Sequence, residues 1–221
     1  MPHLFQCQGC NQSLNWNETP LCLSCRNHFV LAPALCPFCG GLNCDQQKCS
    51  QPWSQHPAIR SYTAQYLAVG NCHQLLRKWK SSGGPSFDRI VFKSYTPPES
   101  VDAIVPIPQR LKRSFELGRS PAHAIANALS RDLKLPVVTA IRIRKRSLQR
   151  QALLRLQQRI ETPQYFEPIS EKLPSLGESV VLVDDFMTSG HTLRRAADVL
   201  NFHGISRIHV FCLGLRPKIG S

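Results

Sequence analysis

The sequence lacks any apolar run that approaches the roughly 20 residues of a membrane-spanning helix. Its first ten residues, MPHLFQCQGC, also lack the charged start and the apolar centre of a signal peptide. Together these two absences predict a cytoplasmic protein without a membrane span. The apolar share of 42% is nevertheless ordinary, so the 221 residues can build a real core, with room for one medium domain and a small appendage.

Acidic residues are also scarce. The chain carries 14 Asp and Glu against 27 Lys and Arg, which gives a net charge of +13. Such an excess favours polyanionic partners, either phosphate-bearing small molecules or nucleic acid, although a solvated basic surface would give the same count. Low-complexity tracts are absent, and no internal repeat extends beyond pairs of cysteines.

Cysteine, by contrast, is abundant, and eight of the ten cysteines lie within the first 49 residues. In a cytosolic protein such crowding indicates metal binding before disulfides. Two C-x2-C turns fit the template of a closed structural zinc site, and a third turn with two later cysteines is predicted to form a second site. A redox dithiol is the alternative for a single C-x2-C turn. We therefore predict one or two zinc ions, held by Cys7, Cys10, Cys22, Cys25, Cys36, Cys39, Cys44 and Cys49.

The pattern of the chain changes along its length. Residues 1–57 are rich in Cys, Pro, Gly and Asn and are predicted to form a double zinc ribbon, while residues 58–221 are predicted to form the second domain. A helix-like apolar set precedes Ser81-Ser82-Gly83-Gly84, and from about residue 101 strand-like and helix-like segments alternate. We expect strands at 101–108, 135–143, 179–185 and 206–215, and helices at 120–133, 147–160 and 192–204. This alternation predicts an α/β domain with a largely parallel sheet flanked by helices.

The expected strand near residue 180 runs into two adjacent carboxylates, Asp184 and Asp185. A Thr-Ser-Gly-His-Thr loop follows at residues 188–192, and a helix is expected from about Leu193. Gly190 allows a tight turn, and hydroxyls together with the first N–H groups of a helix can hold an anion at the carboxyl end of a parallel strand. The carboxylates make sense beside a phosphate if they reach neutral hydroxyls, as in a ribose 5-phosphate unit. The alternative is an ordinary capped turn with solvated aspartates.

The stretch VVLVDDFMTSGHT resembles the phosphoribosyl-pyrophosphate (PRPP) motif of type I phosphoribosyltransferases. The order of a double zinc ribbon, LLRKWK, VPIP, a Q-x2-L-x4-R helix (Gln151, Leu154, Arg159) and this motif resembles the ComF/GntX family over nearly the full length. The resemblance implies a type I phosphoribosyltransferase-like parallel sheet flanked by helices, with a small N-terminal Cys-rich zinc-ribbon module.

The resemblance also implies roles for the residues of the motif. Asp184 and Asp185 would contact the ribose hydroxyls, Mg²⁺ would accompany PRPP, and the 5-phosphate would be surrounded by Thr188, Ser189, Gly190, His191 and Thr192. The chain departs from the family at 113–117, which reads Arg-Ser-Phe-Glu-Leu instead of Arg-Gly-Phe-Asn-Gln, and at Thr162, where Asn is usual. These departures fall where pyrophosphate or an acceptor would be handled, so we predict a binding site and assign no catalytic residue.

A second anion-binding region is predicted from charge. Between Leu133 and Ile160 the chain has eight basic residues and no acid. Together with basic residues after VPIP, this stretch is predicted to bind pyrophosphate or single-stranded DNA, with a solvated helix face as the alternative. The residues singled out are Arg110, Lys112, Arg113, Arg146, Arg150, Gln151 and Arg159. Aromatic candidates for base stacking are few, namely Trp79, Phe115, Tyr165 and Phe166.

Three functions follow from these features. The one we favour is a ComF-type competence protein of the cytoplasm that binds PRPP or a related phosphosugar. It would handle imported single-stranded DNA during natural transformation, alongside competence or recombination proteins. The alternatives are an active phosphoribosyltransferase of nucleotide or nucleobase metabolism, for which no general base is apparent, and a non-catalytic zinc-ribbon adaptor.

Overall fold

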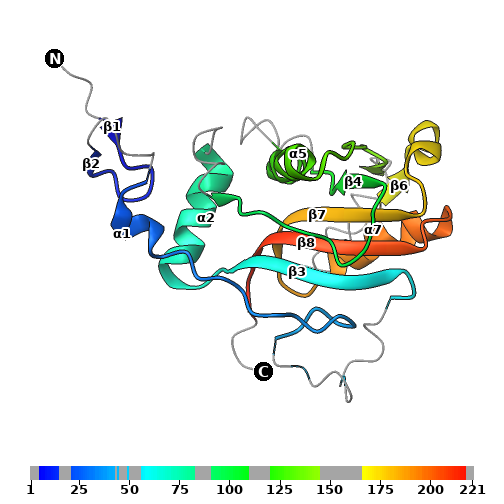
Figure 1. Ribbon diagram of the computed structural model, residues 1–221, viewed down its shortest axis with the longest axis horizontal. Helices are drawn as coiled ribbons and strands as arrows, with labels where there is room; N and C mark the ends of the chain where they lie inside the picture. Colours follow the sequence, from blue (N-terminus) through cyan, green and yellow to red (C-terminus); the bar gives the residue numbers. More distant parts are fainter. Residues whose placement is uncertain are drawn as a thin grey trace, which may run out of the picture.

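The computed structural model describes residues 5–14, 21–42, 44, 49, 56–82, 91–109, 120–144 and 166–217. Among the described residues no helix is both long enough and apolar enough to cross a bilayer. The elements (Figure 1) are β1 (Phe5–Gln6), β2 (Ser13–Leu14), α1 (Leu23–Arg26), β3 (Ile59–Leu67), α2 (Gly70–Ser82), β4 (Ala103–Pro106), α5 (Pro121–Leu133), β5 (Ile141–Ile143), β6 (Phe166–Pro168), the 3-10 helix η3 (Ser170–Ser175), β7 (Ser179–Met187), α7 (His191–Phe202) and β8 (Arg207–Leu215).

Four parallel strands form the central sheet, in the order β3-β8-β7-β4. The two central strands, β7 and β8, are buried along nearly their whole length, as expected for parallel strands covered on both faces. The predicted parallel α/β architecture is therefore confirmed. The sequence reading missed β3, whose mixed sequence IRSYTAQYL lies at one edge of this sheet and lacks a continuous apolar run.

Two of the predicted helices have their expected ends. Ser120 is the N-cap of α5 and Pro121 is its first residue, where the fixed φ of proline is favourable. Gly204 follows α7 with a φ of 95°, as a helix-ending glycine does. The predicted strand at 135–143 is wrong in extent, since only β5 forms a regular strand there and pairs antiparallel with β6. Pro136 has no N–H for a ladder, and the next residue makes only an isolated bridge to β4.

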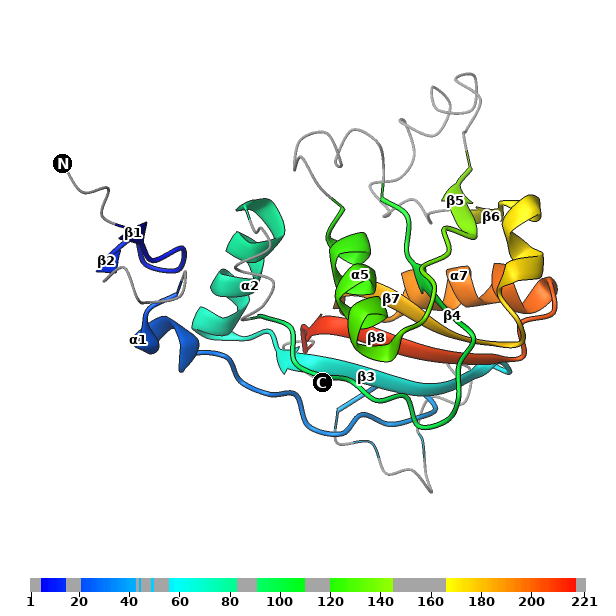
Figure 2. The same cartoon turned by 45° about the horizontal axis from the view of Figure 1, so that its top comes forward.

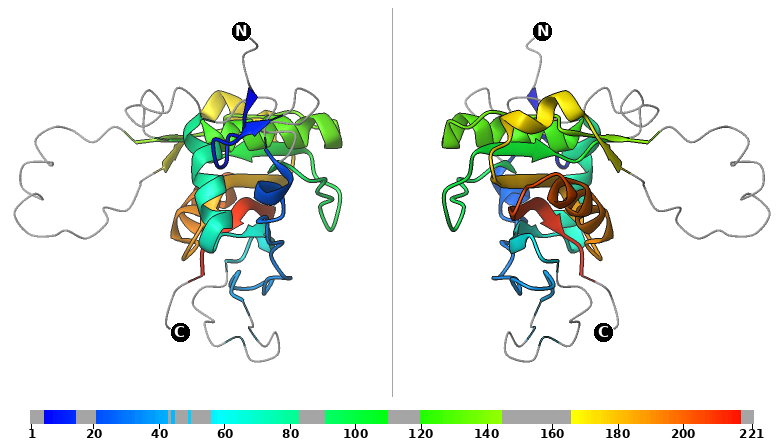
Figure 3. Two further views of the ribbon diagram at one scale, coloured as in Figure 1. Left: turned by 90° about the vertical axis from the view of Figure 1, so that its left-hand side faces the viewer. Right: turned by 90° about the vertical axis from the view of Figure 1, so that its right-hand side faces the viewer.

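Helices cover both faces of the sheet. On one face, α5 packs against β7, and its apolar residues share one core cluster with Val181 and Val183 of β7 and with the apolar residues of α2. On the other face, α7 packs against Val180 and Leu182, because successive side chains of a strand point to opposite faces. Figure 3 shows α5 and α7 on opposite sides of the sheet, and Figure 2 shows α2 and α5 as neighbours.

An irregular segment, residues 92–102, crosses the face of the sheet on which α5 packs (Figure 1). We refer to these residues as the strap. Tyr95 of the strap is buried, and its ring packs against Phe211 of β8 at 4.7 Å between centroids. Near the other end of the strap, Glu99 Oε1 lies 2.9 Å from Nε2 of the buried His209. The strap thus replaces a helix over this part of the sheet.

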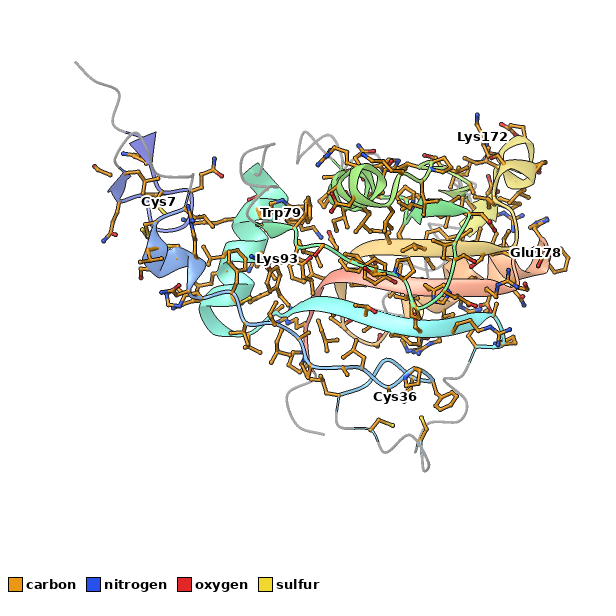
Figure 4. All side chains as sticks on the ribbon, in the orientation of Figure 1. Cys7, Cys36, Trp79, Lys93, Lys172 and Glu178 are labelled. Carbon is orange, nitrogen blue, oxygen red and sulfur yellow. The ribbon has the colours of Figure 1, made fainter. Side chains whose placement is uncertain are left out.

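The Cys-rich segment packs against the sheet domain at two separate places. The β1–β2 hairpin and α1 carry the first four cysteines and pack against α2, where a Cβ on Gly9 would lie 2.7 Å from Leu75. The next cysteines follow a stretch at residues 30–32 that pairs with edge strand β3. Figure 4 labels Cys7 beside α2 and Cys36 below β3. The predicted domain boundary, after residue 57, falls just before β3 and remains a prediction.

Candidate functional site

The two adjacent acids lie inside β7. The pairing of β7 with β8 continues from Asp184↔Cys212 to Met187↔Leu215, so the strand predicted at 179–185 is present and extends two residues beyond its predicted end. Phe186 and Met187 pack into the cores on the two faces, which extends the strand. The loop is therefore only residues 188–190. The helix begins at His191, earlier in the chain than the predicted start near Leu193, so His191 and Thr192 lie in the first turn of α7.

Residues 188–192 form an open cradle at the carboxyl end of β7. Gly190 is the N-cap of α7 with a φ of 71°, a conformation that costs any residue with a Cβ. Among the described residues no side chain hydrogen-bonds at this cap and no acid lies in the first turn, so the first N–H groups are left for another acceptor. Thr188 and His191 are exposed, while Ser189 and Thr192 are half-buried. The predicted loop residues thus meet at the positive end of a helix, where an anion is stabilised.

Arg194 of α7 adds a positive charge to this cradle. Its guanidinium donates to the Ser189 carbonyl, and its Nη1 lies 3.5 Å from the position that a Cβ on Gly190 would occupy. Burial raises the pKa of Tyr62, and the nearby Arg194 guanidinium partly opposes this rise. Sequence reasoning missed Arg194, although its place one turn after the loop glycine is a usable signal.

Asp184 and Asp185 lie in different surroundings. Asp184 is half-buried, and its Oδ1 accepts the Asp185 N–H at 2.8 Å. Asp185 is buried, its Oδ1 accepts the Phe186 N–H at 2.7 Å, and its other oxygen, Oδ2, forms an ion pair with Lys80 of α2. The two predicted sugar-binding carboxylates are therefore not equivalent.

Lys80 is a second residue at the site that sequence reasoning did not single out. It lies four residues after Leu76, which is fully buried, and one residue after Trp79, which is also fully buried. A lysine at that helical spacing falls beside the apolar side of α2. Since a buried lysine needs a partner, this position is the signal that points to a carboxylate across the core.

The other predicted contacts are placed less completely. Phe115 and Tyr165 lie outside the described residues. So do all the residues predicted to bind pyrophosphate or DNA, namely Arg110, Lys112, Arg113, Arg146, Arg150, Gln151 and Arg159. Trp79 is fully buried and Phe166 is 8% exposed, so both are wrong as stacking candidates, because their rings fill the core.

The eight N-terminal cysteines form two groups of four, as predicted: Cys7, Cys10, Cys22 and Cys25, and then Cys36, Cys39, Cys44 and Cys49. Within each group the sulfur atoms lie within 4.8 Å of one another. The Sγ atoms of Cys10 and Cys22 are 3.8 Å apart, which matches the edge of about 3.8 Å for a tetrahedral zinc with Zn–S bonds of about 2.3 Å. The groups can thus each hold one zinc ion.

Backbone N–H groups favour the thiolate form at one sulfur of the first group, that of Cys7. Burial raises the pKa of Cys7, but backbone N–H groups outweigh it and bring the pKa to about 6. The N–H groups of Gly9 and Cys22 both lie 3.3 Å from this sulfur. In the second group the Gly41 N–H lies 3.4 Å from Cys39 Sγ. Such N–H···S contacts support the negative ligands of a closed structural site. The other two cysteines, Cys72 and Cys212, are buried in the core.

The fold and the site first define a class, namely a parallel α/β domain with an anion cradle after a strand that carries two acids, joined to two groups of four cysteines. Residues 91–218 match the phosphoribosyl transferase domain family. Because this match covers more than half of the chain, the protein belongs to that family.

Curated relatives extend the similarity to nearly the whole chain. The chain is 25% identical to DNA utilization protein YhgH of Salmonella typhimurium and 24% identical to the Escherichia coli protein of that name, over 94% of this chain and 95% of each relative. It is 24% identical to Competence protein F of Haemophilus influenzae, over 95% of this chain and 96% of that protein. These relatives and the family match confirm the predicted resemblance to ComF-like proteins with a phosphoribosyltransferase fold.

Proposed function

We propose that this protein is a ComF-type competence protein that binds PRPP or a related phosphosugar in the cradle of residues 188–192. The observation that carries the proposal is the cradle itself, with the left-handed Gly190 at the start of α7 and a half-buried Asp184 in the strand before it. The similarity to Competence protein F and to DNA utilization proteins, which includes the Cys-rich segment, supports a role in handling imported single-stranded DNA.

The charges of the cradle suit a ribose 5-phosphate unit. The 5-phosphate would accept hydrogen bonds from the first N–H groups of α7 and from the hydroxyls of Thr188, Ser189 and Thr192. A helix terminus alone contributes only about 0.3–2 kcal/mol to such binding, so the hydroxyls and the Arg194 charge beside the loop are needed as well. The Asp184 carboxylate would accept hydrogen bonds from the ribose hydroxyls, and Mg²⁺ would accompany the pyrophosphate oxygens.

Titration calorimetry with PRPP and with ribose 5-phosphate, each with and without Mg²⁺, tests the proposed site. We expect Mg²⁺-dependent binding of PRPP and a loss of about 10- to 100-fold in affinity in Asp184→Asn, because a hydrogen bond to a charged group is lost. Thr192→Ala should weaken the binding of both ligands. Asp132→Asn, an exposed acid at the end of α5, is the control and should bind like the wild type. A wild-type chain that binds neither ligand would rule out the site.

Single-stranded DNA is the second proposed partner. Its affinity should fall with salt at a logarithmic slope of roughly −0.7 for each phosphate contacted. Replacing Arg110, Lys112 and Arg113 together by Ala should make that slope shallower by about 2, whereas Lys172→Ala on the exposed η3 should not change it. A salt-independent affinity would contradict DNA binding.

Deleting the gene in a transformable host should abolish transformation by free DNA, and unchanged transformation would contradict the competence role.

A further inference from the structure

The ion pair between Lys80 and Asp185 connects two distant parts of the chain at the cradle. Lys80 lies near the end of α2 and Asp185 lies two residues before the end of β7. The two side chains are only 15% and 8% exposed, respectively. Either charge would be unfavourable at this depth without the other, so the pair fixes where α2 meets the end of β7.

Each oxygen of the Asp185 carboxylate contacts a group within the chain, Oδ1 through a hydrogen bond and Oδ2 through an ion pair. Oδ1 accepts the Phe186 N–H at 2.7 Å and Oδ2 meets the Lys80 ammonium. The ammonium also lies over the Phe186 ring, 5.5 Å from its centroid. The Asp185 N–H itself donates to Asp184 Oδ1. These contacts therefore link three consecutive residues near the end of β7, Asp184, Asp185 and Phe186.

We propose that the two adjacent acids have different roles, with Asp184 contacting the sugar and Lys80 acting as a positioning residue that holds Asp185. This inference rests on the proposed function. The hydrogen bond from the Asp185 N–H then aims the Asp184 carboxylate, and the hold on Phe186 sets the direction in which β7 enters the loop. Lys80 also neutralises the Asp185 carboxylate, which lowers the negative charge that an incoming phosphate meets at the end of β7.

A set of four variants tests this division of roles: Lys80→Met, Asp185→Asn, the double variant and Asp184→Asn. Each single change at the ion pair leaves a buried charge without its partner, so each should lower the melting temperature by roughly 6 °C or more. Each should also weaken the binding of ribose 5-phosphate and the binding of PRPP by the same factor, on the order of tenfold. Asp184→Asn should lose ligand affinity without a comparable loss of melting temperature.

The double variant Lys80→Met/Asp185→Asn is decisive. The introduced amide can still accept the Phe186 N–H and the introduced thioether can still pack on the Phe186 ring, so both the melting temperature and the affinity for ribose 5-phosphate should recover above those of Lys80→Met. If Asp185 contacted the sugar directly, the double variant would bind no better than Lys80→Met, and the proposal would be wrong. The proposal would also be wrong if Lys80→Met lost more affinity for PRPP than for ribose 5-phosphate, because Lys80 would then be a pyrophosphate ligand.

Two controls separate this inference from its premise. Lys172→Met removes one exposed lysine from η3 and should change neither melting temperature nor affinity. If the wild type binds neither phosphosugar, the proposed function fails and the role of Lys80 falls with it. If the wild type binds and the double variant does not recover, only the division of roles between the acids fails.

Discussion

Gly40 places the second cysteine group against the sheet. Its φ is 69°, in the left-handed region. A Cβ at this position would lie 2.9 Å from Cδ1 of Tyr62 and 3.4 Å from the terminal methyl carbon of Met187, the last residue of β7. The glycine is therefore required both by its backbone conformation and by the aromatic ring that it faces.

Replacing Gly40 by Ala should destabilise the protein by about 2–3 kcal/mol, the sum of about 1 kcal/mol of backbone strain and a steric clash that Tyr62 must relieve. Gly70→Ala is the matched control, since Gly70 has a φ of 47° but nothing within 4 Å of its Cβ position, so it should show the strain alone. Urea unfolding monitored by circular dichroism measures both. Equal losses for the two variants would mean that contact with Tyr62 contributes nothing.

At the scale of an element, the strap shows how an irregular segment is held on a sheet. His209 of β8 is 1% exposed, with Glu99 of the strap at one ring nitrogen and Ser61 of β3 at the other, both at 2.9 Å. Burial lowers the pKa of His209; Glu99 opposes this shift and the charges of two nearby arginines, Arg207 and Arg60, add to it. The net direction is downward, so the folded protein favours the neutral imidazole.

The strap should therefore loosen in acid. Because the pKa of His209 is lower in the folded state than in the unfolded state, the unfolded chain binds the proton more readily. The free energy of unfolding then falls as the pH drops below about 6.5, by at most about 1.4 kcal/mol per pH unit for this one group. Urea unfolding at pH 7.5 and pH 5.5 should show a smaller pH dependence in His209→Gln than in the wild type. The exposed His203→Gln should match the wild type, and an unchanged pH dependence in His209→Gln would contradict the assignment.

At the scale of the whole molecule, the two cysteine groups approach the cradle from different directions. The first packs on α2, the helix that carries Lys80. The second reaches Tyr62 and Met187 through Gly40, and Tyr62 lies near Arg194. The Cys-rich segment is thus connected by direct packing to both flanks of the proposed phosphosugar site.

We expect two zinc ions per chain by elemental analysis and one in Cys44→Ser. The buried Cys72→Ala, which belongs to neither group, should keep two. Loss of a structural zinc site removes a large binding free energy, so the melting temperature of Cys44→Ser should fall by about 10 °C or more. Phosphosugar affinity should fall with it, because Tyr62 and Met187 lose their support. A single zinc in the wild type would contradict the second site.

Local sequence patterns were sufficient for much of this architecture. The alternation of apolar strands and amphipathic helices after residue 101 predicts the parallel sheet, because each signal lies within one segment. Ser120 and Gly204 mark helix ends by local backbone chemistry. The C-x2-C turns predict metal ligands for the same reason, since each turn brings two thiolates together within four residues. The edge strand β3 was missed because it lacks the apolar run of its buried neighbours.

The sequence by itself therefore determined the class of fold, the membership of both cysteine groups and the place of the cradle between β7 and α7. Only the tertiary structure decided that Asp184 and Asp185 differ, because Lys80 comes from a helix more than a hundred residues earlier in the chain. It alone brought Arg194 beside Tyr62 and buried Trp79 in the core. The physical reason is that the effect of a charge depends on its partners and its depth, and contacts between distant segments set both.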